Sequence, residues 1–242
     1  MRIAVLTDIH ANLTALRAVL ADIRMREPFQ LVVSAGDQLC GGPRPLETWD
    51  ELQAAGATML KGDTERDLEI GSFKSVPGRG LRRDLILAVF DWTMKRVPED
   101  LRQSAASLPR RLRLQVDNGP ELLLAHANAV NLHEFIWADT PAVELKRLIG
   151  PNPPALMVVG HIHAPLELEY KTTTILRPGS VGLKYEPHWA SVAHWAEVWW
   201  DSEHSAWAYR VHQVEWDHRL EIEAGRAVNY PGVRILPGYE AG

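Results

Sequence analysis

The first sixty residues alternate between short apolar runs and longer stretches with helical spacing. Residues 12–27 carry apolar side chains at helical intervals, and residues 45–56 have Pro45 near the start and Gly56 past the end, as helices often do. Three runs have the length and apolar character of buried strands: RIAVLT (2–7), QLVVSAG (30–36) and TMLKG (58–62). This order predicts right-handed strand–helix–strand units and a largely parallel sheet.

The pattern changes after the third predicted strand. Residues 66–108 contain a flexible loop, SVPGRG, and then two helical stretches at 81–97 and 98–108. We interpret this part as a two-helix insertion rather than another strand–helix unit. After it, the runs at 110–116 and 121–127 flank DNGP and predict a hairpin.

The second half of the chain is richer in strands. Residues 140–150 predict a helix with Thr140 as N-cap and Pro141 at its first position. Residues 154–160 form another apolar, strand-like run, and from Leu166 onward short alternating strands dominate.

These elements predict one α/β domain over residues 1–242. Its architecture is a four-layer α-β-β-α sandwich, in which two mixed sheets pack face to face with helices outside. The helical insertion occupies about 66–108, and a terminal β-rich layer occupies about 166–217.

Composition and charge narrow the classes of function. Net charge is −5, so there is no general attraction to nucleic acid. Cys40 is the only cysteine, which excludes an internal disulfide and a thiolate zinc site. Neither a signal peptide nor a long apolar run is visible, so we expect a cytoplasmic protein without a membrane partner.

Nine tryptophans are many for 242 residues, and six of them lie between Trp189 and Trp216. A tryptophan-rich layer of the terminal sheet is the favoured explanation. The alternative is an exposed aromatic surface that binds a partner or a substrate base.

Polar side chains able to bind metal follow almost every predicted strand. Parallel sheets bind ligands at the carboxyl ends of their strands, so these side chains should meet at one edge. Three carboxylates and four imidazoles without thiolate suit two ions of Mn²⁺, Fe, Zn²⁺, Co²⁺ or Ni²⁺ better than Ca²⁺. The seven residues are Asp8, His10, Asp37, Asp63, His126, His161 and His163.

Taken singly, most of these residues also have a structural explanation. Asp8 could cap the helix that begins near Asn12, Asp37 could open a turn, and Asp63 could cap a short helix. A lone His126 could simply be hydrogen-bonded. The GHIH stretch is harder to explain in this way, because two buried imidazoles without partners are costly. Together, the structural explanations require several coincidences at one place.

With these motifs in order, residues 1–215 resemble the calcineurin-like metallophosphoesterases, most closely their small bacterial and archaeal phosphodiesterase branch. The helical insertion resembles a lid found in that branch. The motifs that carry the resemblance are DIH (8–10), GD (36–37), GDTE (62–65), AHA around His126, GHIH (160–163) and RPGSVG (177–182).

The resemblance implies two metal ions, with Mn²⁺ expected first, and a bridging hydroxide that attacks phosphorus in line. A small phosphodiester is favoured over a phosphomonoester as the substrate. One ion would take Asp8, His10, Asp37 and His163. The other would take Asp63, His126 and His161 and share Asp37 as the bridge.

Two residues of the third motif depart from the family pattern. Asp63 stands where the family has Asn, and Thr64 stands where relatives carry His or Cys. A third carboxylate lowers the formal charge of two dications and their ligands from +2 to +1, which should weaken their Lewis acidity. Thr64 cannot protonate a leaving group at neutral pH, which favours substrates with good leaving groups.

Other residues allow two interpretations. Asn12 could orient a phosphate or cap the first helix, and the cap is favoured. Arg66 could reach a phosphate or lie in solvent at a helix start. The remaining histidines are interpreted as structural or surface residues: His133, His188, His194, His204, His212 and His218.

A second class of function remains open at this point. The chain could be a non-catalytic or weakly active metal-binding scaffold that kept the fold, and Asp63 and Thr64 are its best support. A mononuclear hydrolase or a metal-dependent sensor is a third reading. The acidic chain argues against long nucleic acid as a partner, and a homo-oligomer is compatible with everything seen.

Overall fold

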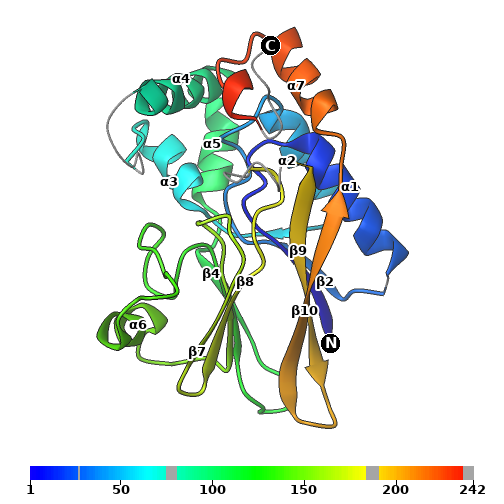
Figure 1. The fold of residues 1–242 in the computed structure, drawn as a ribbon, viewed down its shortest axis with the longest axis vertical. Coiled ribbons are helices and arrows are strands. Elements are labelled where there is room, and N and C mark those ends of the chain that lie inside the picture. Colours follow the sequence, from blue (N-terminus) through cyan, green and yellow to red (C-terminus); the bar gives the residue numbers. More distant parts are fainter. Residues whose placement is uncertain (27, 75–80, 184–190, 237–242) are drawn as a thin grey trace.

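A computed structural model of the chain describes residues 1–26, 28–74, 81–183 and 191–236 (Figure 1). Within this part it holds two five-stranded mixed sheets and seven α-helices, which confirms the predicted α/β class. The SVPGRG stretch, predicted as a loop, lies outside the described residues. No described helix combines the length and the apolar character needed to cross a bilayer.

The first sheet has the strand order β10-β9-β1-β2-β3. Its first three strands along the chain pair in parallel, as predicted, while β9 pairs with β1 and β10 in antiparallel fashion. The helices α1 and α2 connect the parallel strands. The bounds are β1 Arg2–Leu6, α1 Leu13–Met25, β2 Leu31–Ser34, α2 Pro45–Ala54, β3 Thr58–Met59, β9 Val192–Asp201 and β10 Ala206–Glu215.

The second sheet has the order β4-β5-β6-β8-β7. The predicted hairpin of β4 and β5 is present, and β5, β6 and β8 pair in parallel. The bounds are β4 Arg111–Leu114, β5 Leu122–Ala125, α6 Ala142–Ile149, β6 Leu156–Val158, β7 Leu166–Tyr170 and β8 Thr173–Arg177. The terminal strands over 166–217 therefore do not form one layer. Strands β7 and β8 complete the second sheet, whereas β9 and β10 extend the first.

The main core lies between the two sheets. Val5 and Val33 of the first sheet are buried in one apolar cluster with Leu124 and Val158 of the second. The parallel strands are short and apolar on both faces, so each sheet also buries its outer face under helices. The stacking sets the carboxyl ends of β1, β2, β5 and β6 beside one another.

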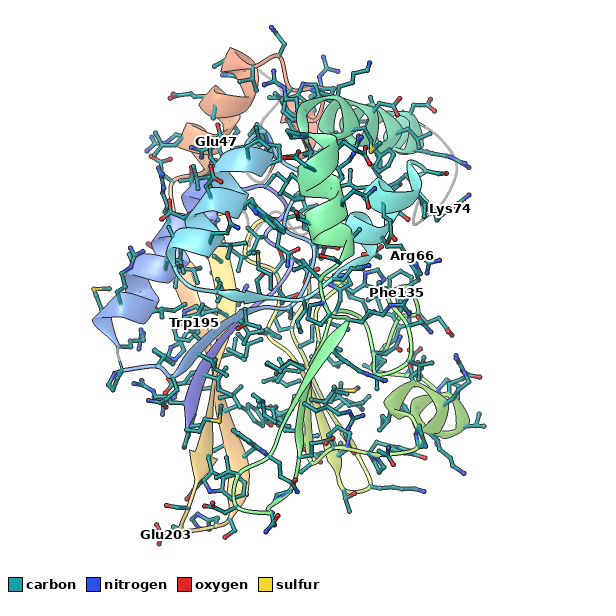
Figure 2. The ribbon with its side chains drawn as sticks, turned by 180° about the vertical axis from the view of Figure 1, so that it is seen from behind. Glu47, Arg66, Lys74, Phe135, Trp195 and Glu203 are labelled. Atoms are coloured by element: carbon teal, nitrogen blue, oxygen red, sulfur yellow. The ribbon has the colours of Figure 1, made fainter. Side chains whose placement is uncertain are left out.

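The outer faces carry separate clusters. On the first sheet, Leu16 and Val19 of α1 pack with Leu6 and Trp195, and Figure 2 labels Trp195. On the second sheet, Leu145 and Leu148 of α6 pack with Met157 and Ile175. These contacts place helices outside both sheets.

The helical insertion contains α3 Asp63–Ile70, α4 Leu81–Arg96 and α5 Glu99–Ala106. The two predicted helices, α4 and α5, are present, and α3 begins earlier than the predicted insertion. Leu68, Phe90 and Ala105 pack with Trp49 of α2 and Ile222 in a cluster of their own. In Figure 1 these helices gather at one end of the molecule, beyond the sheets.

One helix end and one whole helix differ from the sequence prediction. The N-cap of α6 is Pro141 rather than Thr140, because the Thr140 hydroxyl accepts the backbone N–H of Trp137 instead (2.7 Å). Helix α7, His218–Ala227, was not predicted at all. Its signal is Asp217, whose side chain accepts the N–H of Arg219 as an N-cap. Another short helix, of the 3-10 type, spans Val233–Ile235.

The tryptophans of the terminal strands are mostly internal. Trp195, Trp207 and Trp216 are buried, and Trp199 and Trp200 are half-buried. Trp189 lies outside the described residues. Burial in the sheets, the favoured explanation, therefore accounts for those five.

Candidate metal centre

The seven residues predicted as metal ligands all meet at the carboxyl edges of the two sheets. Each lies in the loop that follows a strand or begins α3, so the parallel topology brings them to one place. Six of them form two adjoining groups of three, and within each group the ligand atoms lie within 4.8 Å of one another. The first group is Asp8, His10 and His163, and the second is Asp63, His126 and His161.

The first group is centred on two imidazoles that face each other. His10 Nε2 lies 3.0 Å from His163 Nε2. His163 Nε2 lies 3.6 Å from Asp8 Oδ1, and all three side chains are buried. Thr7 and the His161 backbone N–H donate to the Asp8 carboxylate, which holds it in place.

The second group is equally compact. His126 Nε2 lies 2.9 Å from Asp63 Oδ1 and 3.2 Å from His161 Nδ1. His161 Nδ1 in turn lies 3.3 Å from the same Asp63 oxygen. One carboxylate and two ring nitrogens thus converge on one point, as the ligands of a single ion would.

Asp37 lies between the groups. Its Oδ2 is 3.6 Å from His10 Nε2, and its Oδ1 is 3.5 Å from His126 Nε2. The hydroxyl and the N–H of Thr64 both donate to Oδ1 (2.9 and 3.0 Å). A carboxylate with one oxygen toward each group has the geometry of a bridge between two ions.

The outward nitrogens of three histidines reveal which tautomer each must adopt. His10 Nδ1 faces the Cys40 carbonyl at 2.6 Å, and His126 Nδ1 faces the Ala35 carbonyl at 3.1 Å. His161 Nε2 faces the His133 carbonyl, in the loop after β5, at 3.2 Å. A carbonyl only accepts, so each of these nitrogens carries the proton and the inner nitrogen keeps a lone pair. Metal-binding histidines are usually held in this way.

This arrangement fits divalent cations. Inner nitrogens of neutral His126 and His161 present lone pairs to each other at 3.2 Å, and such an approach is repulsive unless a cation or a proton lies there. The donor set of carboxylates and imidazoles without thiolate suits Mn²⁺ and the related transition ions.

The electrostatics of the metal-free cluster lead to the same conclusion. Burial and the nearby Asp63 raise the pKa of Asp37 well above its usual value. Burial alone would lower the pKa of His126, but the charges of Asp37 and Asp63 outweigh it and raise that pKa strongly. A cation bound here would therefore compete with protons for Asp37 and His126, and its binding should release protons.

The backbone of the site is strained. Of the seven residues, five have φ in the left-handed region, which non-glycine residues rarely adopt. They are Asp8 (55°), His10 (51°), Asp37 (58°), His161 (73°) and His163 (68°). Such strain persists only where the surrounding structure imposes it, and it gathers at functional sites.

Two glycines allow the loops to approach this closely. A Cβ at Gly160 would lie 1.7 Å from Thr7 Oγ1, and one at Gly62 would lie 2.1 Å from Asp37 Oδ1. The first glycine of the GHIH and GDTE motifs is therefore a packing requirement, since a side chain there would displace Asp8 or Asp37.

Glu65, to which no sequence pattern assigns a role, is fully buried beneath the site. Its Oε2 accepts the backbone N–H of Asp37 and of Gly62, both at 2.9 Å. Its Oε1 accepts those of Gln38 (2.9 Å) and Leu39 (3.2 Å). One carboxylate thus ties the loop after β2 to the start of α3. The position of Glu65 at the end of the GDTE motif is the sequence feature that could have indicated this role.

Replacing Glu65 with Gln should destabilise the protein by about 3 kcal/mol, because the amide end leaves two buried N–H groups without an acceptor. A change of that size lowers Tm by roughly 6–12 °C in a chain of this length. Denaturant unfolding measures it, with Glu69→Gln on the same helix as the control, since Glu69 is exposed. Equal stability of the two variants would contradict the role given to Glu65.

The remaining predicted residues have definite positions. Asn12 caps α1, as favoured: its Oδ1 accepts the Ala15 N–H (3.0 Å), and its amide donates to the Gly182 carbonyl (2.8 Å). Both ends of its side chain are thus engaged with backbone, and the catalytic role stays a prediction. Arg66 is half-buried in the first turns of α3.

His133 lies at the site, contrary to its interpretation as structural or surface. Its Nδ1 is 3.9 Å from Asp63 Oδ2, and its carbonyl is the one that orients His161. No spacing pattern marks it, because it lies in the irregular loop after β5.

The other histidines lie outside the two groups. His212 pairs with Glu197 (2.8 Å), His204 pairs with Asp201 at the surface, and His218 contacts the Ser191 hydroxyl. His194 is buried beside Gly179. His188 lies outside the described residues.

Comparisons with known proteins identify the family and the fold of the chain. Residues 1–195 match the family described as the calcineurin-like phosphoesterase superfamily domain. Among solved structures, a hypothetical protein of Pyrococcus horikoshii OT3, PH1004, is 18% identical with a TM-score of 0.77, and covers 99% of both chains. A metallophosphoesterase from Sphaerobacter thermophilus is 23% identical with a TM-score of 0.72, and covers 98% of both chains. No curated protein matches the chain. At these identities the two structures establish the fold.

Proposed function

Because the chain belongs to the calcineurin-like phosphoesterase superfamily, we propose that it hydrolyses small phosphodiesters with two bound divalent ions. The observation that carries this proposal is the pair of adjoining Asp/His groups with Asp37 between them. One ion would be held by Asp8, His10, Asp37 and His163. The other would be held by Asp37, Asp63, His126 and His161.

The metal ions and the protein residues would have different roles in the reaction. When bound, the ions would polarise the phosphoryl oxygens and lower the pKa of water at the site. The residues supply orientation: backbone carbonyls fix the imidazoles of His10 and His126, and Thr64 and Glu65 hold Asp37 and its loop. Burial of the carboxylates excludes competing solvent contacts.

Two features support a diester with a good leaving group. A third carboxylate lowers the positive charge of a site with two dications and so weakens its attraction for an anionic substrate. A singly charged diester loses less of this attraction than a doubly charged monoester. The Thr64 hydroxyl donates to Asp37 and has no proton to give a leaving group at neutral pH.

The direct test is a screen of the protein reconstituted with Mn²⁺ against activated aryl diesters and monoesters, with bound metal measured by elemental analysis. Two metals per chain with faster turnover of the diesters would support the proposal. Two bound metals without turnover of any ester would instead indicate a metal-binding scaffold, and one metal per chain would indicate a mononuclear site.

Asp63→Asn is expected to keep or raise kcat under saturating Mn²⁺, by up to about tenfold, while weakening metal binding. The reason is that a neutral oxygen donates less electron density than a carboxylate to the ion, which then remains a stronger Lewis acid. Steady-state kinetics across a Mn²⁺ titration measures both effects.

Asp67→Asn is the matched control, since Asp67 is a buried carboxylate further along α3 that accepts the Lys74 N–H. It should leave both quantities near their original values. A large loss of kcat in Asp63→Asn at saturating metal would show that the third carboxylate is required for turnover.

A further inference from the structure

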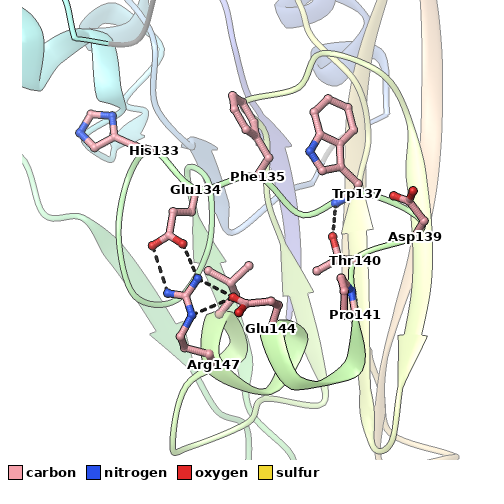
Figure 3. A pocket seen from close by; sticks show the side chains of 10 residues that line it. His133, Glu134, Phe135, Trp137, Asp139, Thr140, Pro141, Glu144 and Arg147 are labelled. Carbon is pink, nitrogen blue, oxygen red and sulfur yellow. Dashed lines mark hydrogen bonds and ion pairs between the residues drawn. The ribbon is translucent and has the colours of Figure 1, made fainter. Parts of the chain in front are cut away.

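The loop after β5 presents two large aromatic side chains to solvent beside the metal centre. Phe135 is 42% exposed and Trp137 is 49% exposed, whereas Trp195, Trp207 and Trp216 are buried. Their rings contact each other with centroids 5.5 Å apart, tilted by 41°. Figure 3 shows both rings rising from the same stretch of loop. Exposing this much aromatic surface does not serve the stability of the fold.

The backbone beneath the two rings is held firmly. Ile136, between them, is 1% exposed and packs in the core cluster under α6. Arg177 donates to the Ile136 carbonyl (2.8 Å), and the Trp137 N–H donates to the Thr140 hydroxyl (2.7 Å). Because the middle residue points inward, its two neighbours point outward together. The pair is therefore preorganised and does not need to be assembled by a ligand.

The pair is joined directly to the predicted ligands. The Phe135 ring stacks on the His161 ring, with centroids 4.6 Å apart and planes inclined by 12°. The rings border an open cavity of about 600 Å³, a size typical of small-molecule sites. Its far wall is formed by Arg147, which pairs with Glu134 and Glu144, as Figure 3 shows.

We propose that Phe135 and Trp137 form a stacking platform for a nucleobase, whose phosphate ester group lies in the metal centre. This inference rests on the proposed function and specifies its substrate as a nucleotide ester. Every base has a flat π-face, and stacking on an aromatic side chain contributes about 1–3 kcal/mol per base.

The charge around the platform is consistent with a neutral ring as the occupant. Glu134, Asp139 and Glu144 line the cavity, and Arg147 is the cation that lines it. This acidic border would repel a second phosphate or an acidic peptide, whereas an uncharged base meets no such penalty.

Two esters with the same leaving group test the platform. The trifluoroethyl ester of thymidine 5′-phosphate carries a base, and methyl trifluoroethyl phosphate carries no aromatic group. Release of trifluoroethanol from each is followed by fluorine NMR, with protein reconstituted with Mn²⁺. The measured quantity is the ratio of kcat/KM for the thymidine ester to kcat/KM for the methyl ester.

Trp137→Ala should lower this ratio by about 5- to 150-fold, mainly through the KM of the thymidine ester. Trp137→Phe should restore much of it. Leu220→Ala removes an exposed apolar side chain on α7 and serves as the control, with an unchanged ratio. An unchanged ratio in Trp137→Ala would overturn the platform, whether the activity on both esters stays the same or falls equally.

If wild type turns over neither ester, the proposed function fails while the platform can still be tested. Calorimetry then compares thymidine 5′-phosphate with methyl phosphate as ligands of the Mn²⁺-loaded protein. A preference for the nucleotide that disappears in Trp137→Ala supports the platform, and the same affinity for both ligands in wild type refutes it.

Discussion

Asp37→Asn is expected to lower kcat/KM on an activated phosphodiester by about 10³-fold, since it removes the charged oxygen shared by the two groups. Stabilisation of transition-state charge by bound metal accounts for several kcal/mol, and each 1.36 kcal/mol corresponds to tenfold in rate. Asn keeps the shape, and its oxygen still accepts the two Thr64 hydrogen bonds. The expected loss is therefore one of metal binding and charge rather than of folding.

The fold itself should tolerate this change. Burial and the charge of Asp63 raise the pKa of Asp37 in the metal-free protein, which means that its negative charge is costly there. Replacing it with a neutral amide then costs little stability without metal. The Tm of metal-free Asp37→Asn should match or exceed that of metal-free wild type.

The control for Asp37→Asn is Asp22→Asn, which changes a buried aspartate of α1 that binds Arg26 and Trp195 far from the cluster. It should keep its turnover. Kinetics at saturating Mn²⁺ and elemental analysis measure the outcome for both variants. Activity of Asp37→Asn within tenfold of wild type, with two metals bound, would show that Asp37 does not bridge.

Addition of Mn²⁺ to the metal-free protein is expected to raise Tm by roughly 5–10 °C per occupied site. A ligand at one hundred times its Kd stabilises the folded state by about 2.7 kcal/mol, and each kcal/mol shifts Tm by about 2–4 °C at this chain length. The metal should stabilise the folded state because its positive charge offsets the repulsion between the buried carboxylates of Asp37 and Asp63. Thermal unfolding across a metal titration measures it.

Two variants test whether each group binds one of the two metal ions. His161→Ala and His163→Ala should each lose about one equivalent of metal, because the two imidazoles belong to different groups despite their spacing. His204→Ala, at an exposed histidine, should lose none. If either single variant lost both equivalents, the two ions would be held as one cooperative unit.

Much of the site could be predicted from the strand pattern. A run such as LMVV is buried on both faces, so the polar residue that follows it must lie at the end of a strand. Parallel strands bring those residues to one edge of the sheet. The sequence alone therefore predicts that His126, His161 and the aspartates lie together. The N-cap at Asn12 could also be predicted from the sequence, because capping depends on only a few neighbouring residues.

Other features depended on contacts between distant parts of the chain. The alternation in β9 and β10 identifies strands but not their partners, so their pairing beside β1 instead of β8 was not predictable. His133 and the Phe135–Trp137 pair lie in a loop without periodicity, and only the packing of Ile136 under α6 determines where they point.

By itself, the sequence determined the α/β class, the order of elements and the identity of seven metal-competent residues, because these depend on local periodicity and on strand ends. The tertiary structure alone decided how Asp37 lies between the two groups, which nitrogen of His10, His126 and His161 faces inward, and how Glu65 supports them. The physical reason is that lone-pair direction and hydrogen-bond partners are set by backbone groups that are remote in sequence and become neighbours only when the two sheets stack.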